Sequence, residues 1–157
     1  MKKVILNISS LVLFFVLSFS TFSCNKISDN GDLDGMWQFM TVSYAHNGVY
    51  DSTINVKDYK SYLSFELSLA KISWINASIT DTTKTILCRF AHQGNTLRLY
   101  NFYFDFPASD SLIADPNTML LSPFGIKGNN ATFTIQEESN HTLILQNDFA
   151  KIFLRKF

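Results

Sequence analysis

The sequence predicts an all-β fold, and three observations lead to this expectation. Short runs of β-forming residues follow one another with frequent turns, which is typical of an antiparallel sandwich or barrel. Several of these runs alternate apolar and polar residues with period two, as in a sheet with one face in water. The chain has 157 residues, 46% hydrophobic and 15% aromatic, which is enough for one domain with a single core. We expect about eight or nine strands.

The first 23 residues have the layout of a secretory signal peptide. A positively charged start, residues 1–3, precedes residues 4–22, which carry no charge and are rich in Leu, Phe and Val. An uncleaved membrane helix is the alternative, because this run has about the 20 residues that a span requires. Its apolar centre, residues 11–17, is short, and polar residues dilute the remainder. We therefore assign residues 1–23 to a cleaved signal peptide.

Cys24 follows the small residue Ser23 directly after the apolar run, and this arrangement resembles a bacterial lipobox. The resemblance implies that Cys24 is lipidated and becomes the first residue of the mature chain, where several acyl chains would hold it in a membrane. Residues 24–34 are polar and lack an apolar period, so they predict a flexible tether between lipid and domain. Cys88 then has no disulfide partner, and we expect it to be a small buried apolar side chain.

The predicted strands begin at Gly35, and turn signals separate them. Asn47-Gly48 lies between two β-rich runs and predicts a hairpin with a type I′ turn. Residues 59–69 alternate with period two and place four apolar side chains on one face: Leu63, Phe65, Leu67 and Leu69. The parity changes at Ala70, which implies either a β-bulge or a tight turn.

Residues 105–130 interrupt the β pattern with a long loop that contains one short helix. Asp115-Pro116 is a favourable helix start, because Asp caps a helix and Pro suits its first position. Residues 119–121 (Met-Leu-Leu) would form the buried side of this helix, and Pro123 would end it. Such a long connection is often a lid or another functional loop. The alternative is a helix that plugs one open end of the fold.

Composition and motifs exclude several classes of function. The formal net charge is zero and no basic run occurs, which argues against nucleic-acid binding. The sequence contains no G-x-S-x-G, no H-E-x-x-H and no glycine-rich phosphate-binding loop. His46, His92 and His141 each lie beside a turn without a motif partner. Glu137 and Glu138 would point to opposite faces of a strand, or both into solvent in a turn, so neither placement makes an acid–base pair. We therefore expect no catalytic residues, no metal site and no cofactor.

One further pattern carries a family resemblance. Gly35-Met36-Trp37 matches the G-x-W that opens the first strand of lipocalins and their calycin relatives. With the hairpin spacing, the Pro123-Phe124-Gly125 bend and the closing Phe153-x-Arg155-x-Phe157, it makes residues 33–157 similar to lipocalin-like lipoproteins of Gram-negative bacteria. An unrelated sandwich with a buried Trp is the alternative.

The resemblance implies a single antiparallel up-and-down β-barrel over residues 35–157. In this family Trp37 would close one end of the barrel, and Arg155 from the last strand would cross the indole ring. That contact would tie the first strand to the last and so remove the free edges of the sheet. The resemblance also implies an exported protein that is anchored by lipid in the cell envelope, at the outer membrane.

Two non-enzymatic functions are compatible with such a barrel. The first is a membrane-anchored binding protein for a small hydrophobic or amphipathic ligand. Alternation alone assigns four candidate ligand contacts to the inner face: Phe39, Phe65, Leu67 and Phe90. The second is an interaction or assembly module with a filled barrel, whose protein partner the sequence does not identify. Its contact patch would consist of three aromatic residues that alternate outward: Tyr100, Phe102 and Phe104. The free volume inside the barrel distinguishes the two.

Overall fold

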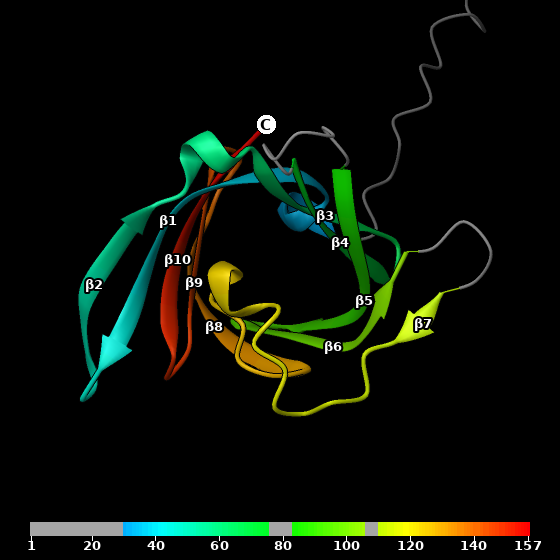
Figure 1. Cartoon of the computed structure of the whole chain (residues 1–157). Coiled ribbons are helices and arrows are strands. Elements are labelled where there is room, and N and C mark those ends of the chain that lie inside the picture. The colour runs from blue at the N-terminus through cyan, green and yellow to red at the C-terminus, as the bar shows by residue number, and fades with distance from the viewer. Residues whose placement is uncertain (1–29, 76–82, 106–109) are drawn as a thin grey trace, which may run out of the picture.

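The structure is a computed structural model that describes residues 30–75, 83–105 and 110–157, so the predicted signal peptide and Cys24 lie outside the described residues. In these ranges the chain forms ten strands that belong to one antiparallel sheet (Figure 1). The strands are β1 (Gly35–His46), β2 (Val49–Asn55), β3 (Ser61–Glu66), β4 (Leu69–Ile75), β5 (Thr83–Gln93), β6 (Thr96–Phe104), β7 (Ser111–Leu112), β8 (Asn130–Glu138), β9 (Thr142–Gln146) and β10 (Ala150–Lys156). Three short 3₁₀ helices accompany them in the same ranges: η1 (Gly31–Leu33), η2 (Lys57–Tyr59) and η3 (Ser122–Phe124).

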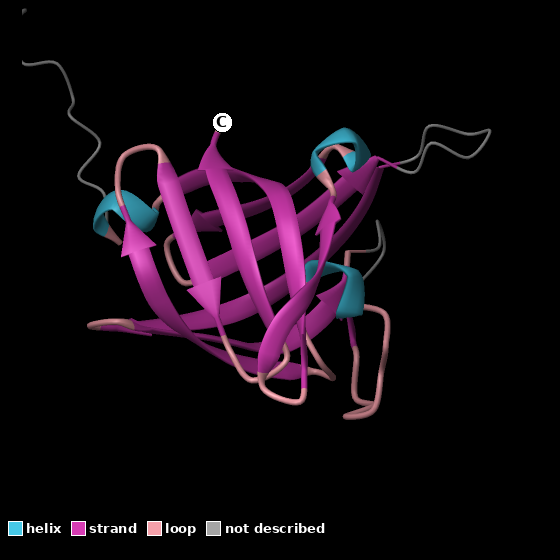
Figure 2. Cartoon of the chain, turned by 90° about the vertical axis from the view of Figure 1, so that its left-hand side faces the viewer, coloured by secondary structure: helices cyan, strands magenta, loops and turns pink. Residues whose placement is uncertain are grey.

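The sheet closes on itself as a barrel. Its strands follow the order β10-β9-β8-β6-β5-β4-β3-β1, and β1 also pairs with β10. Eight strands of the described chain therefore form the wall. Of the other two, β2 pairs with the second half of β1 and β7 pairs with the end of β6. Figure 2 shows near and far strands crossing at an angle, as expected for the tilted strands of a barrel. The predicted antiparallel up-and-down barrel is confirmed.

The hydrophobic core fills the inside of the barrel, because alternate residues of the wall strands are apolar and point inward. On β9, for example, Leu143 and Leu145 are buried between less buried neighbours. Cys88 belongs to this core and has no exposed surface, as expected for a small apolar side chain. Burial raises the pKa of its thiol to about 12, so the group remains uncharged at neutral pH.

The first hairpin has the predicted turn. Asn47 (φ 52°) and Gly48 (φ 78°) both have positive φ, which the type I′ turn requires. Within β1, the register against β10 shifts between Phe39 and Thr41, so Met40 is an additional residue on that strand. This bulge changes the parity of the strand, and the inward positions move from odd to even numbers after it.

The second hairpin corrects the prediction for residues 59–69. β3 ends at Glu66, and Leu67-Ser68 forms the tight turn that leads into β4. Leu67 is 66% exposed and Leu69 is 45% exposed, so neither shares the buried face of Leu63 and Phe65. The prediction failed because Leu67 occupies a turn position with φ of 54°, where Gly or Asn is more usual. Of the two alternatives that the parity change at Ala70 predicts, the tight turn is confirmed, but it lies at Leu67-Ser68, inside the run of apolar alternation.

The strand β6 contains a second bulge, which corrects the predicted aromatic patch. Asn101 has a φ of 53°, and the register against β5 shifts beside it. As a result Phe102 is fully buried on the inner face, whereas Tyr100 lies on the outer face under the guanidinium of Arg98, 5.2 Å from the ring centroid. Phe104 packs against the core as well. The three aromatic residues therefore do not form one outward patch.

The long connection after β6 contains a shorter helix than predicted, and the helix starts later. Asp115 Oδ1 accepts a hydrogen bond from the backbone N–H of Asn117 at 2.9 Å, which makes a local turn rather than a helix start. The helix is η3, and Pro123 lies inside it, because a first helical turn does not need the missing proline N–H. Of residues 119–121, only Leu121 is buried.

The closed end of the barrel includes part of the predicted tether. Leu33 in η1 has no exposed surface, so residues 31–33 pack onto the barrel rather than forming a flexible segment. Trp37 is also fully buried, and its indole Nε1 donates a hydrogen bond to the carbonyl oxygen of Leu33 at 2.8 Å. Trp37 and Leu33 together close this end, as the G-x-W resemblance implied for the tryptophan.

The cation over the Trp37 ring is Lys156, not the predicted Arg155. Lys156 Nζ lies 4.7 Å from the ring centroid. In the β1–β10 register Trp37 pairs with Lys156, and paired residues project to the same face of a sheet. Arg155 pairs instead with Gln38 on the outer face, where its Nη2 donates to Gln38 Oε1 at 3.3 Å. The first and last strands are still linked at this point, but through a different side chain.

This geometry predicts a clear order of stability for two neighbouring variants. Lys156→Ala should lower the free energy of unfolding by about 1–2 kcal/mol, because it removes the cation and the apolar stem that cover the indole. Arg155→Ala, the matched control, should cost less than about 1 kcal/mol, because it removes one part-buried hydrogen bond to Gln38 and no contact with the indole. Urea unfolding followed by far-UV circular dichroism measures both. A larger loss for Arg155→Ala would show that the arginine covers the ring in solution.

Candidate ligand-binding site at the open end of the barrel

The two ends of the barrel differ in how they are closed. β1 runs from the closed end, at Trp37, to the open end, where it turns into β2. The long connection between β7 and β8 also reaches the open end, and η3 lies in the middle of the mouth (Figure 1). The open end is therefore built from connecting segments, as binding sites on rigid scaffolds often are.

Phe124 of η3 fills the mouth of the barrel. Its ring centroid lies 5.3 Å from that of Phe39 on β1 and 5.1 Å from that of Trp74 on β4, and both pairs are tilted by 50°. Tilted aromatic pairs at this distance contribute about 0.5–1.5 kcal/mol each beyond their buried area. Phe124 therefore contacts two sides of the barrel wall, β1 and β4, and is only 7% exposed. Its ring forms a floor below the mouth.

Several contacts hold η3 in this position. Tyr44 Oη donates a hydrogen bond to the carbonyl oxygen of Ser122 at 3.0 Å, and Asn147 Nδ2 donates to that of Gly125 at 3.4 Å. Burial raises the pKa of the Tyr44 hydroxyl, which keeps this donor protonated. Gly125 has a φ of 73°, and a Cβ atom there would lie 2.8 Å from Cδ1 and Cγ1 of Ile152. Only glycine fits this approach without a shift of its neighbours.

The four predicted ligand contacts do not form a common pocket. Phe39, Phe65 and Phe90 face inward, as alternation assigned them. However, Phe39 packs against Phe124, while Phe65 and Phe90 pack against each other with ring centroids 5.0 Å apart. Leu67 lies outside the barrel, in the turn between β3 and β4. The inward rings thus fill the interior at these levels by contacting protein side chains.

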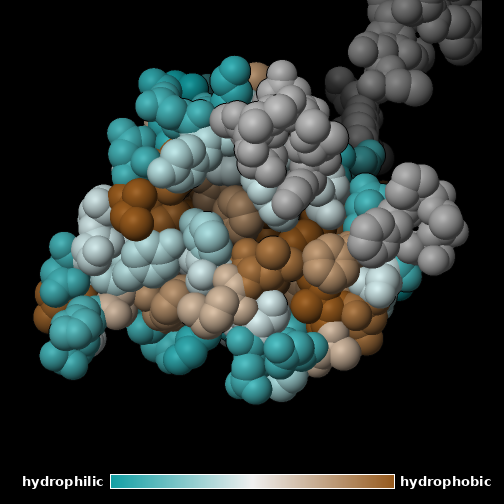
Figure 3. Space-filling model, in the orientation of Figure 1, coloured by the Kyte–Doolittle hydropathy of each residue, from teal (hydrophilic) through white to brown (hydrophobic). Residues whose placement is uncertain are grey.

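An apolar rim surrounds the floor of the mouth. Met119 and Leu120, directly before η3, are 62% and 39% exposed. Ile54 on β2 is 44% exposed and pairs with the inward-facing Val42. Because paired residues project to the same face of a sheet, the Ile54 side chain points toward the mouth as well. Figure 3 shows apolar surface gathered in the middle of this face, around the hollow of the mouth. We refer to Ile54, Met119 and Leu120 as the rim, and to Trp74 and Phe124 as the floor.

The sequence did not identify the floor or the rim. The Pro123-Phe124-Gly125 bend belongs to the family pattern, whereas no motif marks Trp74. The sequence predicts Met119 and Leu120 on the buried side of a helix, but both side chains are exposed in the structure. Their exposure follows from the short length of η3, which sequence propensities do not predict.

The floor and the rim consist of apolar and aromatic side chains. Among the described residues, no group of three or more His, Cys, Asp or Glu side chains is placed to bind a metal ion. His92 Nε2 lies 2.8 Å from the carbonyl oxygen of Gly94 and 3.8 Å from a carboxylate oxygen of Glu138. None of these three residues belongs to the floor or the rim. In the part of the chain that the structure describes, no helix is sufficiently long and apolar to span a membrane.

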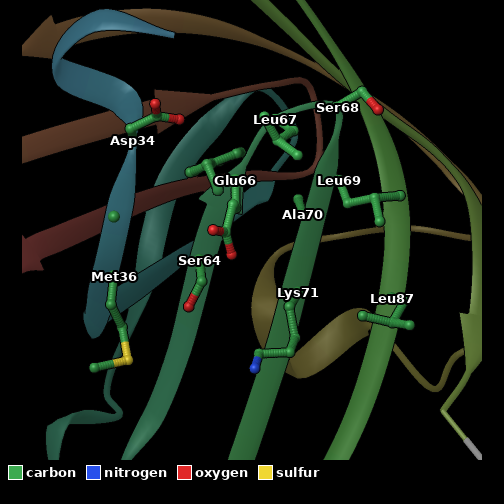
Figure 4. Close-up of a pocket in the computed structure, with 12 residues that line it drawn as sticks. Asp34, Met36, Ser64, Glu66, Leu67, Ser68, Leu69, Ala70, Lys71 and Leu87 are labelled. Atoms are coloured by element: carbon green, nitrogen blue, oxygen red, sulfur yellow. The ribbon is translucent and has the colours of Figure 1, made fainter. Parts of the chain in front are cut away.

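A groove of about 720 Å³ lies at the other end, on the outer face of the wall. It is lined by residues of β1, β3, β4 and β5 and by the β3–β4 turn (Figure 4). One row of paired residues crosses these four strands, and its side chains point outward from the barrel into the groove: Met36, Ser64, Lys71 and Leu87. This groove is separate from the floor and rim.

The chain belongs to the lipocalin-like family, since a family model described as a lipocalin-like domain matches residues 15–157. The structure resembles the crystal structure of a lipocalin-like protein from Bacteroides uniformis, with a TM-score of 0.59 and 20% identity over 81% of this chain and 100% of that one. It also resembles the crystal structure of an uncharacterized protein from Bacteroides eggerthii, with a TM-score of 0.58 and 14% identity over 80% of this chain and 99% of that one. None of the curated proteins matches the chain.

The contact between η3 and the barrel wall predicts the effect of a glycine substitution. Gly125→Ala should lower the free energy of unfolding by about 2–5 kcal/mol, because it adds a clash with Ile152 to the strain of a positive φ. Gly94→Ala is the matched control, since Gly94 also has a positive φ but its Cβ would meet nothing within 4 Å. That variant should lose only about 1–2 kcal/mol. Equal losses of unfolding free energy in the two variants would mean that Gly125 does not pack closely against Ile152 of β10.

Proposed function

We propose that this protein is a non-catalytic, lipid-anchored binding protein that holds a small hydrophobic or amphipathic ligand at the open end of its barrel. The observation that carries this proposal is the exposed apolar rim above the aromatic floor of Trp74 and Phe124. Binding sites for small apolar molecules are concave, rich in aromatic side chains and poor in charges. The mouth of a lipocalin-like barrel offers this combination.

We place the ligand above η3 rather than deep in the barrel. Phe124 occupies the interior between β1 and β4, and hydrogen bonds from Tyr44 and Asn147 support its segment. A ligand on the floor would cover Met119, Leu120 and Ile54, whose exposed apolar surface gains about 25 cal/mol for each Å² removed from water. Its polar end would remain in water, which suits an amphipathic molecule such as a fatty acid.

A second function, an interaction or assembly module with a filled barrel, is favoured by the packing of the interior. Phe39 against Phe124 and Phe65 against Phe90 occupy space that a deep ligand would need. In that case the same rim would contact a partner protein of the cell envelope. The two functions differ in what covers Met119 and Leu120, and a small-molecule titration distinguishes them.

The position of Trp74 provides a direct test of ligand binding. The chain has two Trp residues, of which Trp37 is buried at the closed end and Trp74 lies at the mouth. Brominated dodecanoate should quench up to about half of the tryptophan emission of residues 25–157, since it would contact only one indole. The Trp74→Phe variant should lose this quenching. Quenching that persists in Trp74→Phe would place the ligand elsewhere, and none in either protein would favour the interaction module.

The rim predicts a matched pair of affinity variants. Met119→Asp should weaken dodecanoate binding by about tenfold, or 1.4 kcal/mol, because a carboxylate would replace an apolar contact beside the ligand. Val49→Asp is the control, because Val49 is also 62% exposed but lies at the tip of the β1–β2 hairpin. Isothermal titration calorimetry gives both dissociation constants. Equal affinities for the two variants would contradict a site at the rim.

The proposed anchor is the lipid on Cys24, and the proposed location is the outer membrane of a Gram-negative cell. Cells that express the full chain and receive labelled palmitate should produce labelled protein. Cys24→Ala should carry no label, because it removes the thiol to which the lipid would be attached. Cys88→Ala should keep the label, since this thiol is buried in the core. Label retained in Cys24→Ala would refute the anchor.

A further inference from the structure

The outer groove and the β3–β4 turn lie beside the start of the described chain. Asn30 Nδ2 donates a hydrogen bond to the carbonyl oxygen of Leu67 at 2.9 Å, so the amino-terminal segment enters the barrel at this turn. Asn30 Nδ2 also donates to Asp34 Oδ1 at 2.6 Å. Only residues 25–29 separate Cys24 from Asn30, and a chain of this length extends no further than about 21 Å. A membrane that holds Cys24 is therefore close to the turn.

The tip of this turn is apolar and exposed. Leu67 is 66% exposed, and its φ of 54° is uncommon for a bulky side chain. Asn or Gly would adopt this conformation more easily, but they would not present an apolar group to the surroundings. Leu69, at the start of β4, is 45% exposed on the outer face. The two leucines continue into the apolar part of the groove, which Met36 and Leu87 also line (Figure 4).

Charged groups border these leucines on both sides. Lys71 lines the groove, and Arg89 pairs with Leu69 across the β4–β5 ladder. Their long side chains are able to lie along apolar surface while their charges reach phosphate groups. Asp34 and Glu66 line the same groove, so acidic groups offset the basic ones. The apolar side chains, rather than net charge, would therefore supply the attraction.

We propose that the β3–β4 turn docks on the lipid bilayer, with Leu67 and Leu69 inserted at the headgroup boundary and the open end of the barrel directed away from the membrane. The inference rests on the proposed anchoring of Cys24. The tether alone restrains only the distance to the membrane, whereas the two leucines fix the orientation of the barrel. The mouth with its rim then faces the aqueous side, where it exchanges its ligand.

The test uses the full lipidated chain in vesicles of phosphatidylethanolamine and phosphatidylglycerol that contain a doxyl-labelled lipid. A cysteine introduced as Leu67→Cys carries a nitrobenzoxadiazole fluorophore. Cys24 is blocked by its lipid and Cys88 is buried with a pKa of about 12, so only the introduced thiol reacts. Val49→Cys is the matched control, because Val49 is 62% exposed against 66% for Leu67 but lies at the open end.

The fluorophore at position 67 should be quenched about twofold or more by the doxyl lipid, while the one at position 49 should not. In a second variant, Leu67→Asn with the fluorophore at Leu69→Cys, quenching should fall, although Asn tolerates the positive φ and preserves the turn. Quenching of Leu69→Cys that does not depend on residue 67 would contradict insertion of Leu67.

Failure of the anchor and failure of the docking give different results. If the full chain does not float with the vesicles, the anchor is wrong and the docking falls with it. If it floats but positions 67 and 49 are quenched equally, the anchor stands and the docking is refuted. If position 67 is shielded from iodide in native membranes but not quenched by doxyl lipid, a protein, a second copy of this chain included, covers the turn and the bilayer does not.

Discussion

The register between β1 and β10 determines how the sheet closes and which side chains fill each end of the barrel. It joins the first strand to the last and so leaves the eight-stranded wall without free edges. The same register places Trp37 and Lys156 on the inner face at one end. Further along, after the bulge at Met40, it sets Val42 opposite Ile152, beside the space that Gly125 enters. The closed end and the plugged mouth are therefore two consequences of one strand pairing, separated by one bulge.

The mouth combines a rigid floor with an uncovered apolar rim, and this combination is the basis of the proposed function. A filled interior normally favours a structural role, because a barrel without free volume has no space for a ligand. Here the filling comes from η3, a segment of a connecting loop, rather than from the wall alone. Phe124 thus converts a deep barrel into a shallow site, and Met119 and Leu120 extend that site outward. The docking of the opposite end would keep this site in contact with water.

Much of the fold was predictable from local patterns, whereas the site was not. Asn47-Gly48 and the buried Trp37 follow from residue type and position, since turn chemistry and the G-x-W pattern are local. Leu67 and Asn101 have positive φ without a glycine to indicate it. The parity change at Ala70 therefore indicates a bulge or a turn without locating it at Leu67, and no residue type marks the bulge at Asn101. Each changed the parity of the residues after it in the strand and so moved side chains to the face opposite the predicted one.

Which cation covers the Trp37 ring, Arg155 or Lys156, could not be predicted from the sequence of the last strand alone. Two cations adjacent in sequence point to opposite faces, and the half-buried Phe153 makes both faces of β10 partly apolar. Only the pairing with β1 decides which cation covers the indole. The position of Phe124 likewise depends on Phe39 and Trp74, which lie far from it in sequence.

A ¹H–¹⁵N nuclear magnetic resonance titration of residues 25–157 with dodecanoate would show whether a ligand binds on the floor at the open end or inside the barrel. We expect amide shift changes concentrated in residues 118–126, at Trp74 and at Ile54, with little change near Phe65 and Phe90. Changes centred on Phe65 and Phe90 would place the ligand inside the barrel and refute the proposed site, as would the absence of any saturable change.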